Sequence, residues 1–332
     1  MHVLVTGGAG YIGSHVVLAL RDAGHPVVVF DNLSTGRKQA IPAEVAFVEG
    51  DVGDSELTGR VIECFDVSAV IHFAGSIVVS ESVRNPLEYY RNNTSASRSL
   101  LASCVSKGVR HFVFSSTAAV YGSPAVVPVT EDTPPAPINP YGASKLMTEW
   151  MLRDTAAAHD VTYVALRYFN VAGADPLGRT GQSTPFATHL LKVACEAAVG
   201  RRDHVEVFGR DYDTPDGTCI RDYIHVTDVA DAHVKALKYL AAGGASIVLN
   251  CGYGRGYSVV DVLSQVQKRA AKRFEVRQAP RRPGDPAILV ADATRLRQTL
   301  QWEPQFTDLG SIVQTALDWE LRDIQGVGAV RR

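Results

Sequence analysis

Short apolar runs alternate with longer stretches of helical spacing along the first half of the chain. The apolar runs cover residues 2–6, 26–30, 45–48, 68–74, 110–114 and 161–166. Runs of this length, bounded by turn residues, are typical of strands buried on both faces of a sheet. Helical spacing marks 14–22, 54–65 and 86–106 between them. This alternation predicts an α/β fold with a doubly wound parallel sheet of the Rossmann type.

The pattern changes beyond about residue 171. Loops lengthen over 173–184 and 209–218, helices are expected over 226–240 and 258–269, and a strand over 247–250. Residues 276–292 are expected to form an arginine-bearing loop. We therefore expect a first lobe over residues 1–170 and a smaller α/β substrate-binding lobe over 171–332, with 222–252 returning to the first.

Composition excludes several classes of protein. The net charge of −2 and the lack of a long charged run argue against a nucleic-acid surface. No apolar run approaches the ~20 residues that span a bilayer, and the N-terminus enters a strand with no signal-like segment, so we expect a cytoplasmic protein. The five cysteines are scattered without a Cys-x-x-Cys pair, so neither disulfides nor a metal site are expected.

Three glycines follow the first strand at the spacing Gly-x-x-Gly-x-x-Gly, namely Gly7, Gly10 and Gly13. Glycines let backbone N–H groups approach a pyrophosphate closely, and the N-terminus of the following helix carries a partial positive charge. Because strand, loop and helix occur in this order, the sequence predicts a dinucleotide-binding loop.

The second predicted strand ends at Asp31, roughly 20 residues beyond the glycine loop, where a carboxylate accepts both ribose hydroxyls of adenosine. It would repel a 2′-phosphate, which favours NAD over NADP, although Arg37 and Lys38 nearby keep NADP open as an alternative. The third strand ends at Asp51, where the carboxylate is expected to meet the adenine amino group.

Further polar side chains are expected near the same edge of the sheet. His72 lies within an apolar strand, where we expect a packed, hydrogen-bonded side chain rather than a catalyst. Amides weaken a helix interior, so one of Asn92 and Asn93 is expected to bond a neighbouring loop. The strand over 110–114 leads into Ser115, Ser116 and Thr117, and ligands of parallel sheets bind at the carboxyl ends of strands.

A tyrosine and a lysine stand four residues apart in the sequence Tyr141-Gly-Ala-Ser-Lys145, directly after Pro140. Proline suits the first turn of a helix, so both side chains should lie on one helical face. A phenol with a pKa near ~10 is a poor base at neutral pH, and a neighbouring ammonium lowers that pKa. The spacing alone is common on ordinary helices, but the upstream motifs favour a pair that takes a proton from a hydroxyl.

Longer stretches of the chain carry a family resemblance. They are Val5–His15, Val70–Gly75, Glu81–Val83, Asn85–Tyr90, Leu166–Asn170 and, most specifically, Gly217-Thr218 followed by Ile220–Val226. Together they resemble the extended short-chain dehydrogenases/reductases, and within them the nucleotide-sugar epimerases, along nearly the whole chain. The resemblance implies NAD-dependent interconversion of UDP-glucose and UDP-galactose, by oxidation at C4 to a 4-keto sugar, rotation and re-reduction with recycled NAD.

The resemblance also implies roles for individual residues. Tyr141 would be the base at the O4 hydroxyl, Lys145 would hold the nicotinamide ribose and lower the tyrosine pKa, and Thr117 would bond the same hydroxyl. The implied cofactor contacts are Gly7, Gly10, Tyr11, Ile12, Gly13, Asp31, Asn32, Asp51, Val52, Phe73, Ala74, Gly75, Asn92, Ser115, Tyr141, Lys145 and Tyr168. The implied substrate contacts are Thr117, Tyr141, Asn170, His189, Leu190, Phe208, Arg221, Arg282, Asp285 and Leu289.

Within the substrate set, Arg221 and Arg282 would bind the diphosphate, Asp285 the uridine ribose, and Phe208 the uracil ring. The chain departs from the family pattern at three positions. Ile77 replaces a lysine that often reaches the cofactor, and His189 replaces an asparagine near the diphosphate. Leu289 replaces either a tyrosine or a small residue at the hexose pocket, so the resemblance leaves room for UDP-GlcNAc and UDP-GalNAc.

Three alternatives stay open at this point. The nearest are 4-epimerases of UDP-xylose/arabinose or UDP-glucuronate, which share nearly all these motifs. A nucleotide-sugar 4,6-dehydratase or decarboxylase needs a carboxylate just after the strand-end hydroxyls, where this chain has Ala118 and Ala119. A non-catalytic NAD-binding scaffold would not need the Tyr141–Lys145 pair. The family resemblance also implies a homodimer packed through the helices around 86–106 and 142–157.

Overall fold

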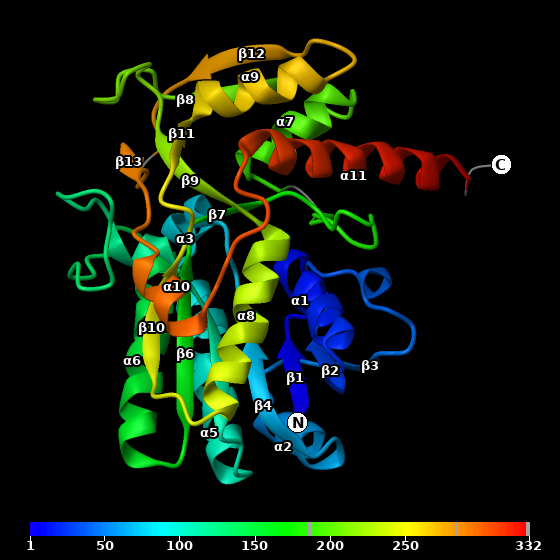
Figure 1. Cartoon of the computed structure of the whole chain (residues 1–332), viewed down its shortest axis with the longest axis vertical. Helices are drawn as coiled ribbons and strands as arrows, with labels where there is room; N and C mark the ends of the chain where they lie inside the picture. Colours follow the sequence, from blue (N-terminus) through cyan, green and yellow to red (C-terminus); the bar gives the residue numbers. More distant parts are fainter. Residues whose placement is uncertain (185–186, 283, 330–332) are drawn as a thin grey trace.

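A computed structural model describes residues 1–184, 187–282 and 284–329. Within them, seven parallel strands form a sheet in the order β10-β6-β5-β4-β1-β2-β3 (Figure 1). The strands are β1 (His2–Thr6), β2 (Val27–Asp31), β3 (Ala46–Glu49), β4 (Val67–His72), β5 (His111–Thr117), β6 (Thr162–Tyr168) and β10 (Ile247–Cys251). The predicted doubly wound α/β fold is therefore confirmed.

Helices cover both faces of this sheet because its strands are apolar on both sides. On one face, Val3 and Val5 of β1 share a core with α1 (Tyr11–Asp22) and α8 (Val226–Ala241). On the other face, Leu4 shares a second core with α2 (Ser55–Cys64), α5 (Ala96–Ser106) and α6 (Pro140–Ala158). Successive β1 side chains thus enter different cores, as the two-residue period of a strand requires.

A second group of elements is stacked over one end of the large sheet (Figure 1). It contains a four-stranded sheet of β7 (Asn170–Ala172), β9 (Ile220–His225), β11 (Gly256–Ser258) and β13 (Ile288–Leu289), and the parallel pair β8 (His204–Phe208) and β12 (Glu275–Ala279). The helices α7 (Leu190–Ala198), α9 (Val259–Arg269) and α11 (Leu309–Ala329) share a separate core with these strands.

More elements of the C-terminal half pack with the large sheet than the sequence suggested. Within 222–252, β10 is a strand of the large sheet and α8 packs on one of its faces, whereas β9 lies in the smaller sheet. Further along, α10 (Thr294–Leu300) and Trp302 also pack into the core beneath α8, a return that the sequence analysis did not anticipate. The lobe boundary near residue 170 stays a prediction.

Two expected elements differ from the structure. The helix expected over 86–106 is present and continuous, but a π-helical turn over Tyr90–Ser95 lies between α4 (Pro86–Tyr89) and α5, where the amides of Asn92 and Asn93 bond the side chain and backbone of Ser76. The loop expected over 276–292 contains β13 and most of β12, because pairing with β9 and β8 outweighs its weak apolar pattern. No helix of the described residues is long and apolar enough to cross a membrane.

Candidate active site

A cavity of about 440 Å³ opens at the carboxyl ends of the large parallel strands, beneath the smaller lobe. All sequence-predicted site residues line it except Leu190, Phe208 and Arg282. Residues that the sequence analysis had not assigned to the site also line it, among them Ser76, Glu81, Gln182 and Thr184. Glu81 stood within a quoted family motif, whereas Gln182 and Thr184 lie in a loop whose path only the tertiary structure defines.

The backbone of the glycine loop packs so tightly against neighbouring backbone that side chains at Gly7 and Gly13 would not fit. Gly7 has φ +69°, and a Cβ there would lie 2.5 Å from the Ala74 nitrogen. A Cβ on Gly13 would lie 2.3 Å from the Gly7 carbonyl oxygen. The N-cap of α1, Gly10, has no side-chain cap and the first turn has no acidic residue. The loop therefore offers unshielded N–H groups to an anion such as a pyrophosphate.

Asp31 is buried beside this loop and organises it. Its carboxylate accepts hydrogen bonds from the Ala9 N–H at 2.9 Å and the Leu33 N–H at 2.8 Å. Burial raises the pKa of Asp31, although these two bonds act in the opposite direction. The Asn32 amide donates to Asp51 at 3.1 Å, so the two acids and Asn32 lie along one wall of the cavity. These residues fit the adenosine half of a dinucleotide.

The two cations that kept NADP open are engaged elsewhere. The Arg37 Nε donates to the Ser183 carbonyl at 3.0 Å. The Lys38 ammonium lies 5.0 Å from the centre of the Phe47 ring. With Asp31 facing the cavity and neither cation lining it, the site favours a 2′-hydroxyl over a 2′-phosphate.

Asn92 and Asn93 position the loop that follows β4. The Asn92 amide donates to Ser76 Oγ at 2.8 Å, as the sequence analysis expected of one of the two amides. The buried Asn93 accepts from the Ser76 N–H at 2.7 Å and donates to Ser144 Oγ at 3.0 Å. A Cβ on Gly75 would lie 2.9 Å from the Asn93 oxygen. Asn93 thus joins the Ser76 loop to α6, a role that its sequence position alone did not show.

The start of α6 places Tyr141 and Lys145 at the cavity. Asn139 caps the helix by accepting the Gly142 N–H at 2.9 Å, and Pro140 fills the first turn. Lys145 is buried, and its ammonium donates to the Ser115 carbonyl at 3.1 Å. Burial lowers the pKa of Lys145 to about 8.

The expected lowering of the Tyr141 pKa by Lys145 is not met in the protein alone. Burial raises the pKa of the Tyr141 phenol, and a hydrogen bond with the Thr117 side chain acts in the opposite direction. The Lys145 ammonium instead bonds the Ser115 carbonyl. Thr117 Oγ1 also accepts the Ala119 N–H at 3.1 Å, which fixes the hydroxyl at the end of β5 facing Tyr141.

The substrate side of the cavity carries Arg221, Asp285, Asn170 and His189. The Arg221 guanidinium donates to the Ile220 carbonyl at 2.9 Å and lies 3.7 Å from the Asp285 carboxylate. His189 Nδ1 is 2.8 Å from the Gln182 amide nitrogen. An arginine held between a carbonyl and a carboxylate is well placed to meet a phosphate.

Three predicted substrate residues lie outside this cavity. The Arg282 guanidinium lies over the Phe208 ring at 3.7 Å, and neither residue lines the cavity in the described part of the chain. This cation–π contact satisfies both side chains locally. Leu190 lines a smaller cavity of about 20 Å³, which Asn170 and His189 also border. The predicted substrate contacts of Phe208, Arg282 and Leu190 therefore stay predictions.

Three further positions can be compared with their expectations. His72 is buried between Thr6 at 2.6 Å and Ser97 at 2.8 Å, which confirms it as a packed strand histidine. Leu289 borders the cavity and packs among Tyr121, Leu146 and Phe169. Ile77 lines the cavity and is 44% exposed, so no cation stands there.

Comparison with known proteins agrees with this geometry. A model of the NAD dependent epimerase/dehydratase family matches residues 3–252. The UDP-glucose 4-epimerase of Azospirillum brasilense is 61% identical over 326 residues, covering 98% of this chain and 94% of that protein.

Two solved structures share the fold at high identity. The UDP-glucose 4-epimerase of Brucella ovis in complex with NAD is 45% identical, with a TM-score of 0.92 and coverage of 96% of this chain and 97% of that one. The UDP-Glc/GlcNAc 4-epimerase of Campylobacter jejuni is 47% identical, with a TM-score of 0.84 and coverage of 97% and 99%.

Proposed function

The chain belongs to the NAD dependent epimerase/dehydratase family, and we propose that it interconverts UDP-glucose and UDP-galactose by inverting C4 of the hexose. The observation that carries the proposal is the convergence of Tyr141, Thr117 and Lys145 with the glycine loop and Asp31 on one cavity. NAD, when bound, supplies the reversible hydride acceptor for C4. The residues that would hold it are those of the glycine loop, Asp31 and Lys145.

Tyr141 would take the O4 proton during oxidation and return it during reduction. Its contact with Thr117 keeps the phenol oxygen aimed at the cavity, and both hydroxyls would bond the same sugar oxygen. Protonated Lys145 would hold the nicotinamide ribose, and its charge would favour the ionised phenol that a base needs. Lys145 is buried, so its charge is screened weakly by water.

Inversion requires that the sugar ring turn over while the rest of the substrate is held. Arg221, with Asp285 beside it, would hold the diphosphate and ribose, and Asn170 and His189 would lie next to them. The hexose would lie against apolar side chains of the cavity such as Leu289, Ala118 and Val79. Few directional contacts at that end would allow the 4-keto sugar to present either face.

The absence of a carboxylate at positions 118 and 119 separates this activity from dehydration. Ala118 and Ala119 line the cavity directly after Thr117. Neither can remove a proton from C5 or donate one at C6. The 4-keto sugar therefore has no partner in that part of the wall for elimination and is returned to the hexose.

UDP-GlcNAc is a second candidate substrate, and Leu289 is the observation that favours it. Leucine borders the cavity where a tyrosine would occupy more of the hexose pocket. The Campylobacter jejuni relative acts on both UDP-Glc and UDP-GlcNAc by its name. An N-acetyl group beside Leu289 would meet an apolar surface that suits its methyl group.

A homodimer and a cytoplasmic location complete the proposal. Leu87 is 80% exposed on α4, Trp150 is 48% exposed on α6, and both helices were expected at the dimer contact. Large apolar side chains exposed on helices that pack together favour burial against a second copy. The five free cysteines, four of them buried, suit a reducing compartment.

The test is a mixing experiment without added cofactor. Purified protein is given UDP-glucose, and separately UDP-GlcNAc, UDP-xylose and UDP-glucuronate, and NMR follows the C4 epimers. Nucleotide released on denaturation is identified by mass spectrometry. Formation of UDP-galactose with NAD in the protein supports the proposal. A 4-keto-6-deoxy or decarboxylated product, or bound NAD with no sugar turnover, would contradict it.

A further inference from the structure

The segment 173–184, here called the strap, runs from the end of β7, past α1, to the cavity. At its two ends, the Tyr11 hydroxyl donates to the Gly173 carbonyl at 2.6 Å and Arg37 bonds the Ser183 carbonyl at 3.0 Å. Gln182 and Thr184 of the strap line the cavity together with the glycine loop. The end of the strap therefore supplies part of the cavity wall.

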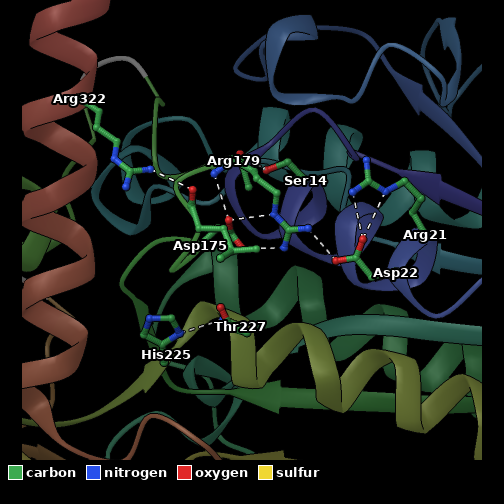
Figure 2. Close-up of polar contacts among 10 residues, drawn as sticks. Ser14, Arg21, Asp22, Asp175, Arg179, His225, Thr227 and Arg322 are labelled. Atoms are coloured by element: carbon green, nitrogen blue, oxygen red, sulfur yellow. Dashed lines mark hydrogen bonds and ion pairs between the residues drawn. The ribbon is translucent and has the colours of Figure 1, made fainter.

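Arg179 is the charged centre of the strap (Figure 2). Its Nε and Nη2 donate to the two carboxylate oxygens of Asp175 at 3.0 and 2.8 Å. Its Nη1 reaches outside the strap to Asp22 at 2.7 Å, in the last turn of α1. One guanidinium thus orders the strap internally through a bidentate pair and fastens it to α1.

Asp175, which Arg179 holds within the strap, is a buried acid. Asp175 is 7% exposed. Burial alone would raise the pKa of Asp175, but the hydrogen bonds from Arg179 outweigh it and hold the pKa below its ordinary value. Without Arg179, Asp175 would be a buried carboxylate lacking its cation, which disfavours the observed loop conformation.

The strap is also held from the side of the smaller lobe. Arg322 of α11 donates to the Leu177 carbonyl at 3.0 Å, and Figure 2 shows it reaching the strap from that helix. Gly178 has φ +70°, and a Cβ there would lie 1.2 Å from the Arg322 Nη1. Because α11 anchors one side of the strap, the Arg179–Asp22 bridge links the smaller lobe to the C-terminal end of α1.

We propose that Arg179 is a positioning residue that fastens the strap to α1 through Asp22 and thereby retains NAD between turnovers. The inference rests on the proposed function, since it requires that NAD occupy the cavity. The strap supplies cavity wall through Gln182 and Thr184, while α1 begins at the glycine loop. Separation of the strap from α1 would loosen the part of the cavity wall that Gln182 and Thr184 supply, so the bridge would oppose release without touching the cofactor.

Two variants test the bridge from its two ends. The Asp22 side chain on α1 is 45% exposed. Asp22→Asn removes its charge and leaves the Arg179–Asp175 pair in place. Arg179→Met removes both contacts. The matched control is Arg153→Met, which breaks an exposed pair with Asp154 at 2.8 Å on α6. Each protein is loaded with isotopically labelled NAD and diluted into unlabelled NAD, and the label still bound is followed by gel filtration and mass spectrometry.

Release should be about 2–5-fold faster for Asp22→Asn and about 3–10-fold faster for Arg179→Met, with the control unchanged. The double variant should release NAD no faster than Arg179→Met, since both changes act on one bridge. Turnover at saturating NAD and the thermal unfolding midpoint should stay close to the parent for Asp22→Asn, which a general structural defect would not permit.

Unchanged release in both variants, or rates that multiply in the double variant, would overturn the inference and leave the proposed function standing. Should Arg179→Met fail to fold, Asp22→Asn alone decides, because it leaves the buried pair intact. A parent protein that neither contains nor takes up NAD would overturn the proposed function and the inference together.

Discussion

Burial at the active site changes the pKa values of the two side chains expected to act in catalysis. Tyr141 and Lys145 stand four residues apart on α6, yet burial shifts them in different senses. The pKa of the phenol rises and that of the ammonium falls to about 8, so burial favours the neutral form of both. Thr117, which bonds Tyr141, is the protein group that counters this effect on the phenol.

Replacing Tyr141 by phenylalanine should remove the proton acceptor and little else. We expect kcat to fall by about 10²–10⁴-fold, the usual contribution of a positioned acid–base group. NAD content should stay at the parent level, since the phenyl ring keeps the volume of the side chain. The measurement is UDP-galactose formation by NMR together with bound NAD per chain. A scaffold without catalytic function would show no change in either quantity.

Leu289→Tyr should narrow the hexose pocket. Turnover of UDP-GlcNAc should fall by about 10–100-fold relative to the parent, whereas that of UDP-glucose should change by less than about 3-fold. Leu289→Met, which keeps the volume, is the control and should behave as the parent. If parent and Leu289→Tyr both fail on UDP-GlcNAc while both act on UDP-glucose, Leu289 does not admit the N-acetyl group.

The sequence predicted the site residues whose chemistry is local. The glycine spacing, Asp31 at a strand end and the Tyr141–Lys145 pair each follow from one short segment, and all of them line the cavity. The position of Arg282, in the loop after β12, depends on a contact with Phe208 of β8, and that of Thr184 on the path of a long loop. The hydrophobic periods of strands and helices, two and 3.6 residues, predict neither a contact between distant segments nor the path of a loop.

At the scale of elements, a buried charge network holds α6 against the sheet. The Arg167 guanidinium of β6 binds Glu149 of α6 at 2.9 and 2.5 Å and the Tyr121 hydroxyl at 2.9 Å. Ser116 of β5 donates to the same carboxylate. Because Glu149 follows Lys145 by one helical turn, the network fixes the helix that carries the catalytic pair.

Glu149→Gln should lower the free energy of unfolding by about 3–5 kcal/mol, because it leaves the Arg167 charge buried without a counter-ion. The double variant Glu149→Met/Arg167→Met removes both charges and should be more stable than Glu149→Gln by at least about 1 kcal/mol. Urea unfolding measures both. A double variant that is less stable than the single one would show that the hydrogen bonds, rather than the charge balance, hold α6.

Element boundaries were predictable wherever packing and local preference agree. The cap Asn139, with Pro140 after it, begins α6 where the sequence placed it. The π-helical turn before α5 was not predictable as a geometry, because it arises from the bonds of Asn92 and Asn93 to Ser76, a residue more than a dozen positions away. The same holds for β12, whose strand conformation depends on β8.

Over the whole molecule, buried histidines link stability to pH. Burial lowers the pKa of His72 and His225 to about 3, and that of His15 and His233 to about 4. They lie in four different elements or element ends, so protonation strains the large sheet, α1 and α8 together. In the unfolded chain a histidine binds its proton near pH ~6.5, well above these folded values.

The unfolded state therefore binds more protons than the folded state between pH 6.5 and the folded pKa, and stability falls as pH falls through that window. For His233 alone, whose folded pKa is about 4, the loss between pH 7.5 and pH 5 amounts to about 2 kcal/mol. Four such groups add up to a large part of a typical total stability of about 5–15 kcal/mol. We expect acid unfolding to begin well above pH 4.

Urea unfolding of parent and His233→Met at pH 7.5 and pH 5 tests this. His233 lies against the Phe73 and Tyr168 rings at 4.8 and 5.9 Å, and its Nε2 is buried without a hydrogen-bond partner in the described residues. Methionine can fill that apolar site, so the pH-dependent loss should shrink by about 2 kcal/mol. The exposed His159→Gln should leave the loss as in the parent. If the free energy of unfolding falls equally in parent and His233→Met, the folded protein binds a proton at His233 as readily as the unfolded chain does. Water would then reach the space beside Phe73 and solvate the charged ring.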